Sequence, residues 1–258
     1  MTRLVDPPPI PAVVLLARDA WRLGLAAIRG MPVLFGTTFA LLLAFELVFH
    51  VQHPPVPGQA GTAALLWGFA NDIATDVLGA SAFVGVHRAI LLGEAADRPA
   101  WRLPPGYDGY VLWLVGLSLP LLPFAVMDAM AGPGYSLQGM AALLLVLVGG
   151  VAVTLRLALL LPLHATEALV ADPGTVWDAT RGTAWRLLAA VLLTFVPMEA
   201  GAALLAGPLR GMGGAEAVVL AALGDAFKAL LWGAVGAALW SRLLQTYGGA
   251  LAQPPVWR

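Results

Sequence analysis

Five ionisable residues lie within apolar stretches of this sequence, and their side chains are of the kinds that carry protons or bind cations. They are Asp72, Asp76, Glu199, Asp225 and Lys228. A charged side chain at the centre of a membrane helix costs about 2.5 to 3.5 kcal/mol on insertion scales, so each of the five needs a partner or a purpose. Counted from the ends of the apolar stretches, all five lie at a similar depth near the membrane midplane.

The spacing along each stretch groups these residues further. Asp72 and Asp76 are four residues apart. Asp225 and Lys228 are three residues apart. Residues three or four apart share one face of a helix, so we predict that both pairs point into a helix bundle.

Two interpretations of this acidic cluster remain open. In the first, carboxyl groups that gain and lose protons within the membrane form a proton relay or a cation or solute site. In the second, Lys228 pairs with Asp225 or Asp76, and the charges form a structural hydrogen-bonded network. This network fixes the register of the helices relative to one another.

Other polar residues lie nearer the ends of the apolar stretches. Arg156 is close enough to an inner end for its side chain to extend towards the headgroups, with a lipid-phosphate contact as the alternative. Glu46 lies near an outer boundary and is expected to be hydrated. His50 and His53 could share a metal ion, but no carboxylate cluster is evident that would complete the site. We therefore predict no metal site, no cofactor and no enzymatic activity.

The composition indicates a membrane protein. Of the 258 residues, 60% are apolar and 11% are charged, and the mean hydropathy is +0.83. A soluble domain carries about 25% charged residues. The absence of cysteine excludes disulfides, thiolate metal ligands and cysteine nucleophiles. We expect one all-α, membrane-embedded domain over residues 1–258, in contact with the lipid bilayer and not with nucleic acid.

The elements that must position the ionisable residues are long apolar helices. In residues 12–30, Arg18, Arg22 and Arg29 project from one side of an amphipathic pattern. This is typical of a helix lying in the membrane interface, and an early extension of the first span is the alternative. We predict about six transmembrane helices, over residues 31–50, 62–91, 107–130, 137–163, 185–206 and 215–244.

The distribution of arginine predicts the orientation of these spans. Turn sequences such as Pro54-Pro55-Val56-Pro57-Gly58 and Gly132-Pro133-Gly134 separate the apolar stretches. With a cytoplasmic N-terminus, eleven arginines fall in inner segments and only Arg210 in an outer turn. Because Lys and Arg are retained on the cytoplasmic side, we predict a multi-pass protein of the bacterial inner membrane with both termini cytoplasmic.

The tetrapeptide Ala-Trp-Arg-Leu occurs three times, at residues 20–23, 100–103 and 184–187. A tryptophan beside an arginine suits a membrane boundary, because the indole lies at headgroup level and the guanidinium stays hydrated. We therefore expect three interfacial anchors on one membrane face. They are Trp21 with Arg22, Trp101 with Arg102, and Trp185 with Arg186. The copies are compatible with three tandem two-helix units, and repeated use of a good anchor is the alternative.

One segment of 32 residues resembles a known family. Arg156 and Pro162 are followed by a connector with Glu167 and Asp172-Pro173, and then by Thr180-Arg181-Gly182-Thr183-Ala184-Trp185-Arg186-Leu187. This order is similar to that of bacterial YciC-like inner-membrane proteins, a membrane domain also fused to some glycerophosphodiester phosphodiesterases. The chain departs from the family pattern where a serine precedes the elbow, offering Asp178 and Thr180 instead. The resemblance implies a multi-span membrane domain and does not imply phosphodiesterase activity.

These observations support two classes of function. The first prediction is a membrane scaffold, assembly or interaction protein, in which glycine-rich helix faces contact other membrane proteins. The alternative is a proton-coupled transporter or channel-like protein that uses the acidic cluster. The oligomeric state is not predicted.

Overall fold

The structure, a computed structural model, describes residues 10–53, 62–123, 126, 137–168, 172–209 and 214–247. Within these ranges the regular elements are helices and no strand occurs. Five helical stretches are long and apolar enough to cross a membrane: Pro32–Gln52, Leu66–Leu91, Gln138–Ala165, Ala184–Leu204 and Gly214–Thr246. The protein is therefore an all-α helical bundle of the multi-pass membrane class, as the sequence predicts.

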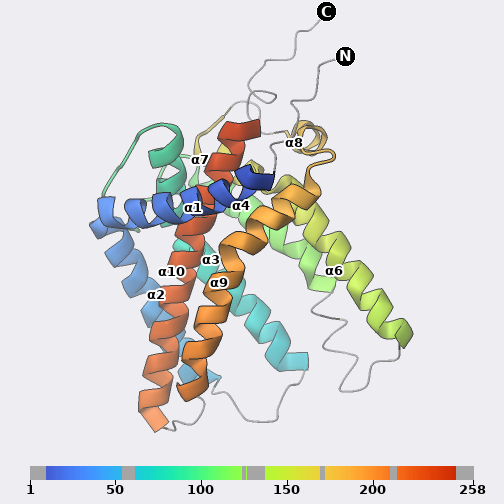
Figure 1. Ribbon diagram of the computed structural model, residues 1–258. Coiled ribbons are helices and arrows are strands. Elements are labelled where there is room, and N and C mark those ends of the chain that lie inside the picture. The colour runs from blue at the N-terminus through green and yellow to red at the C-terminus, as the bar shows by residue number, and fades with distance from the viewer. Residues whose placement is uncertain are drawn as a thin grey trace, which may run out of the picture.

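The bundle has two distinct ends. The long helices are α2 (Pro32–Gln52), α3 (Thr62–Leu91), α6 (Leu137–Leu157), α9 (Ala184–Leu209) and α10 (Gly214–Tyr247). In Figure 1, α2 and α10 run from one end of the bundle to the other, whereas α3 and α6 are inclined to them. One end carries α7 (Leu160–Ala165) and α8 (Pro173–Ala179), and we call it the α8 end. The other is called the opposite end.

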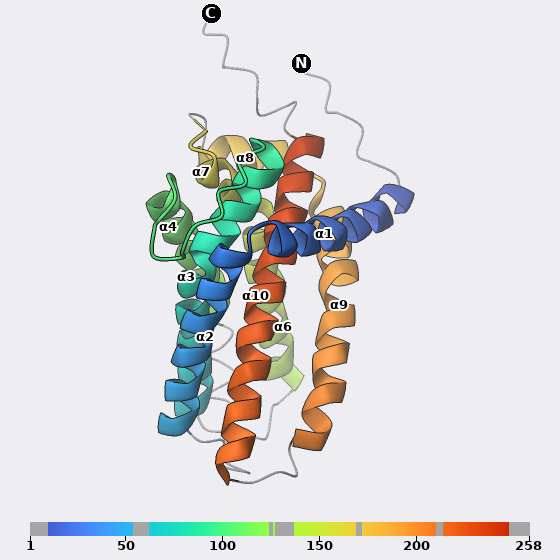
Figure 2. The same cartoon turned by 90° about the vertical axis from the view of Figure 1, so that its left-hand side faces the viewer.

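The helix α1 (Ile10–Gly30) lies across the long helices near the α8 end, as both views show (Figures 1 and 2). It is a separate helix, because the backbone leaves helical geometry at Met31 before α2 begins. The alternative of an early extension of the first span is therefore wrong. Arg18, Arg22 and Arg29 are exposed, whereas Ala20 is fully buried against the bundle. This orientation is the one that the amphipathic pattern predicts.

Two contacts fix α1 to α9 and α10, the last two helices that the structure describes. The indole Nε1 of Trp21 donates to the carbonyl oxygen of Thr194 in α9 at 3.0 Å. The guanidinium of Arg242 in α10 pairs with the carboxylate of Asp19 at 3.0 Å. The first described helix is thus held by the last two.

The central helix of the bundle is α10, which contacts α1, α2, α3 and α9. Its close approach to α3 depends on Gly233. A Cβ atom at this position would lie 1.9 Å from Cζ of Phe83, a buried residue of α3. The missing side chain therefore makes room for the phenyl ring, as small residues commonly do between membrane helices.

The predicted third and fourth spans are interrupted. The helix α4 covers Tyr107–Ser118 and passes into a 3₁₀ turn, Leu119–Leu121, that contains Pro120. Residues 124–125 and 127–136 lie outside the described residues, as do the predicted turns at 54–58 and 132–134 and Arg210. The helix α6 ends at Leu157, and after a short turn α7 begins at Leu160. Pro162 has no N–H group for the fourth preceding carbonyl, which favours this break.

The three Ala-Trp-Arg-Leu copies lie towards the α8 end, two of them in helices and one in a turn segment. The first lies in the middle of α1, the second in turns between α3 and α4, and the third begins α9. Trp101 and Trp185 are 66% and 82% exposed, whereas Trp21 is partly buried against α9. The copies share a level in the bundle, but they are not structurally equivalent.

Candidate functional site

Three side chains from two helices meet in the half of the bundle nearer the opposite end. They are Glu46 and His50 of α2 and Asp225 of α10. The Nε2 atom of His50 lies 2.9 Å from Oδ2 of Asp225 and 3.9 Å from Oε2 of Glu46. One ligand atom from each residue lies within 4.8 Å of the other two. We call this group the Glu46 cluster.

Glu46 is the most enclosed member, with a side chain that is 2% exposed. Its Oε1 atom accepts hydrogen bonds from the hydroxyl of Thr75 at 3.1 Å and from the amide of Asn71 at 3.3 Å. Its Oε2 atom is buried without a hydrogen-bond partner in the described part of the chain. The Oε1 atom is therefore hydrogen-bonded by residues of α3, whereas the Oε2 atom faces His50.

The remaining two members are more accessible. The side chain of His50 is 16% exposed and that of Asp225 is 52% exposed. Glu46 lies six residues before the end of α2, which at 1.5 Å per residue is about 9 Å along the helix. Glu46 is therefore the enclosed carboxylate of the cluster, and Asp225 is the exposed one.

Helical spacing explains why α2 supplies two of the three groups. Glu46 and His50 are four residues apart, so their side chains lie on the same face of α2. That face packs against both α3 and α10, since α2 contacts each of them. The hydroxyl oxygen of Thr75 also lies 2.7 Å from the carbonyl oxygen of Asn71, so its single proton is shared between that oxygen and Oε1 of Glu46.

The structure divides the five residues predicted from the sequence. Lys228 pairs with Glu199 of α9 at 3.0 Å, so the prediction that it pairs with Asp225 or Asp76 is wrong. Asp225 pairs with His50 instead. Asp72 is exposed and Asp76 is half-buried, both on α3. The sequence predicts that Asp225 and Lys228 point into the bundle; each contacts a neighbouring helix, but their side chains remain 52% and 42% exposed.

Two further expectations about this region are wrong. Glu46 is not hydrated, because it is among the most buried polar residues. His50 does not lack neighbouring carboxylates, because it has two. His53, its expected metal-binding partner, stacks instead with the rings of Phe49 and Trp67, at centroid distances of 4.9 and 4.8 Å. The i, i+4 spacing of Glu46 and His50 is the signal in the sequence that could identify the pair.

The Glu46 cluster can bind a proton or a metal cation. Imidazole nitrogen together with carboxylate oxygen is a ligand set that suits divalent metals such as Zn²⁺. Metal bonds of about 2.0 to 2.2 Å to each ligand would need only small side-chain movements from the present positions. A proton shared between His50 and either carboxylate is the simpler alternative.

Arg156 forms a separate polar centre at the α8 end. Its guanidinium stacks on the indole of Trp177 in α8, 3.5 Å from the ring centroid, and donates to the backbone oxygen of that residue. Its Nε atom donates to Thr180 at 3.4 Å. The side chain therefore reaches the connector that contains α8, and the connector holds it in place. The expected lipid-phosphate contact stays a prediction.

The connector that holds Arg156 begins with a capped helix. Oδ2 of Asp172 accepts hydrogen bonds from the backbone N–H of Thr175 at 2.8 Å and from its hydroxyl at 3.0 Å. These hydrogen bonds hold the pKa of Asp172 below its ordinary value. After α8, Gly182 has φ +78°, a left-handed conformation that favours glycine. The Thr-Arg-Gly elbow is thus a turn that α9 follows directly.

Comparisons of the chain with protein-family models, with curated proteins and with solved structures find no match.

Proposed function

We propose that this integral membrane protein binds and releases a proton or a divalent cation at the Glu46 cluster, as part of cation-coupled transport or channel-like conduction. The observation that carries the proposal is the buried Oε2 atom of Glu46. It has no hydrogen-bond partner in the described ranges, and it lies 3.9 Å from His50.

The cost of this arrangement supports a role in binding. A buried charged group without full compensation destabilises a membrane protein, so such groups mark ion paths and proton relays more often than structural contacts. The Oε2 atom of Glu46, without a hydrogen-bond partner among the described residues, faces the imidazole of His50, and imidazole and carboxylate groups can both bind a proton or a metal ion. Asp225, on the exposed side of His50, can exchange the cation with its surroundings.

The experiment is cation flux into vesicles that contain the full chain. A pH-sensitive dye reports proton entry and a Zn²⁺-sensitive dye reports metal entry, each under an imposed membrane potential. We expect Glu46→Gln to reduce the flux at least about tenfold, since loss of a group at a metal site costs 10- to 100-fold. Glu216→Gln is the matched control, because Glu216 is an exposed residue in the first turn of α10. Equal flux in wild type, Glu46→Gln and empty vesicles would overturn the proposal.

We also propose a second function, as a membrane scaffold, assembly or interaction protein. The observation in its favour is the Glu199–Lys228 pair, whose side chains are 46% and 42% exposed although both lie well inside long apolar helices. Exposure of such a pair to lipid is costly, whereas a polar group on a neighbouring membrane protein would compensate it.

Mass measurement in lipid nanodiscs tests this second proposal. We expect wild type to assemble with another membrane protein or a second copy, and the double variant Glu199→Gln with Lys228→Gln to lose that partner. The variant Glu216→Gln is again the control. A lone chain for wild type in every lipid mixture would contradict an assembly role.

We also propose a family, a membrane location and an orientation for this protein. The order Arg156, Pro162 and the Thr180-Arg181-Gly182 elbow supports membership of the YciC-like family. The arginine bias supports a bacterial inner-membrane location with both termini cytoplasmic. Labelling of single cysteines introduced beside Arg102 and within the outer turn at Arg210 tests the orientation, and labelling of the first from outside intact cells would contradict it.

A further inference from the structure

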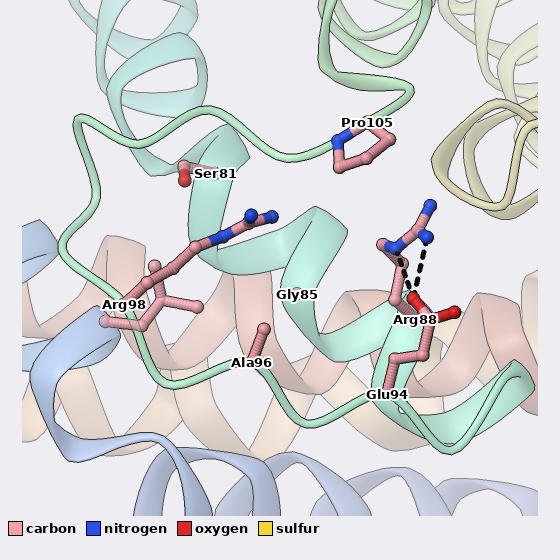
Figure 3. A pocket seen from close by; sticks show the side chains of 8 residues that line it. Ser81, Gly85, Arg88, Glu94, Ala96, Arg98 and Pro105 are labelled. Atoms are coloured by element: carbon pink, nitrogen blue, oxygen red, sulfur yellow. Dashed lines mark hydrogen bonds and ion pairs between the residues drawn. The ribbon is translucent and has the colours of Figure 1, made fainter.

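A pocket of about 170 Å³ lies at the α8 end, between α3 and the segment that joins α3 to α4. Ser81, Gly85 and Arg88 line it from α3, and Glu94, Arg98 and Pro105 line it from the joining segment. Figure 3 shows the side chain of Arg98 extending from the joining segment across the pocket towards α3, while Arg88 lies on the other side beside Glu94. None of these residues belongs to the Glu46 cluster.

The charges around the pocket are not balanced. Glu94 is occupied, since its Oε2 atom accepts hydrogen bonds from Nε and Nη2 of Arg88 at 3.0 and 2.6 Å. Asp97 is also occupied, because its carboxylate accepts hydrogen bonds from the first N–H groups of α2. Arg98 forms neither a hydrogen bond nor an ion pair with any residue that the structure describes. Its positive charge therefore has no partner in the pocket.

A buried hydroxyl group is the second feature without a partner. Ser81 is 3% exposed, and its Oγ atom has no hydrogen-bond partner in the described part of the chain. Buried hydroxyl groups in proteins are nearly always satisfied, so one that lines a pocket indicates a ligand with an acceptor atom. Ser81 and Arg98 thus offer one neutral and one charged donor to the same space.

We propose that this pocket binds an anionic phosphate group, with the Arg98 guanidinium donating to two phosphate oxygens and the Ser81 hydroxyl donating to a third. A guanidinium matches the geometry of phosphate and binds it through paired, charge-assisted hydrogen bonds. Arg88 forms part of the wall of the pocket, and its charge is already offset by Glu94, so Arg98 supplies the positive charge for the phosphate. The Arg88 guanidinium stays fixed, because Nη1 also donates to the carbonyl of Ala165 at 3.1 Å.

The surroundings favour a phospholipid headgroup over free phosphate as the source. Trp101 and Leu103, in the same joining segment as Arg98, are 66% and 53% exposed. Exposed tryptophan and leucine beside arginine are typical of a segment at headgroup level. An anionic lipid such as phosphatidylglycerol would reach the pocket from that level.

The experiment is native mass spectrometry of the full chain from vesicles of phosphatidylglycerol and phosphatidylcholine in equal amounts. We expect wild type to retain phosphatidylglycerol, Arg98→Gln to retain at least fivefold less, and Arg98→Lys to fall between them. Ser81→Ala should also reduce retention. Arg181→Gln is the matched control, because Arg181 is an exposed arginine at the same end of the bundle and does not line the pocket. Thermal unfolding of each variant separates loss of binding from loss of fold.

A titration with inorganic phosphate separates the two sources. If millimolar phosphate stabilises wild type but not Arg98→Gln, and phosphatidylglycerol is not retained, the site takes free phosphate and the phosphate-binding proposal stands. If Arg98→Gln and Ser81→Ala match wild type with both probes while remaining folded, the proposal is overturned.

Discussion

The imidazole Nε2 of His50 lies 2.9 Å from the carboxylate Oδ2 of Asp225, so α2 and α10 are joined by a polar contact between residues 175 positions apart. In a membrane bundle, such contacts contribute about 0.6 kcal/mol on average and at most about 1.7 kcal/mol. We expect a coupling free energy in this range from a double-mutant cycle with His50→Gln and Asp225→Asn. Reversible unfolding in mixed detergent measures it. A coupling near zero would show that the two side chains do not stabilise each other.

Replacement of Glu46 by glutamine separates binding from stability. The glutamine side chain would keep an acceptor for Thr75 and Asn71, and it would remove a buried carboxylate whose Oε2 atom has no hydrogen-bond partner among the described residues. Because removing a buried, poorly compensated charge is often neutral or stabilising, we expect a free energy of unfolding equal to or above that of wild type. We expect Zn²⁺ affinity, measured by calorimetry, to fall at least about tenfold in the same variant. Strong destabilisation with unchanged Zn²⁺ affinity would identify a structural role.

The close approach of α3 and α10 predicts a large effect of one methyl group. In Gly233→Ala the new Cβ atom would overlap the ring of Phe83, which is buried and must move. Overpacking of this kind costs about 1 to 3 kcal/mol. Gly224→Ala on the same helix is the control, because no atom lies within 4 Å of a Cβ there. Equal unfolding free energies for the two variants would contradict the packing of these helices.

The planar guanidinium of Arg156 holds the connector at the α8 end in place. We expect Arg156→Lys to lose the stacking on Trp177 and the hydrogen bond from Nε to Thr180, at a cost of about 1 kcal/mol. Limited proteolysis between α6 and α9 should then be faster than in wild type. Arg181→Lys is the control, since Arg181 is an exposed residue of the same connector. The same proteolysis rate in both variants would show that Arg156 does not hold the connector.

The cap of α8 should weaken in acid. Hydrogen bonds from Thr175 lower the pKa of Asp172 in the folded protein. A lowered pKa means that the stabilising effect is complete above the ordinary value of 3.8 and is lost as the pH falls through the folded value. We expect amide exchange at Thr175, corrected for intrinsic rates, to accelerate below that pH. In Asp172→Asn this acceleration should be absent, and its persistence would assign the effect to another group.

Most of the fold is predictable from the sequence, because apolar helices of membrane length leave a strong signal. The predicted span at 62–91 coincides with α3, and the span at 31–50 differs from α2 by one or two residues at each end. The interruption near Leu119 is less predictable, since a proline in a membrane helix is compatible with both a kink and an end. The separation of α1 from α2 at Met31 likewise depends on how α1 packs on α9 and α10.

The candidate site is much less predictable. The depth of each ionisable residue follows from the sequence, but its partners depend on helix rotation. Lys228 contacts α9 and not α3, and Asp225 contacts α2. Distance along the chain places Glu46 at a hydrated boundary, whereas α3 covers it with Thr75 and Asn71. Neither the rotation nor the cover can be derived from hydrophobic periodicity alone.

The position of α1 has a consequence for the order of assembly. Trp21 and Asp19 contact α9 and α10, which emerge from the ribosome more than 150 residues after α1 is complete. At about 5 to 20 residues per second, roughly 10 to 40 seconds pass between the end of α1 and the synthesis of Arg242. During that time the amphipathic surface of α1 must be held by the membrane or a chaperone. The packing of α1 is therefore completed only after α10, the last described helix, has been synthesised.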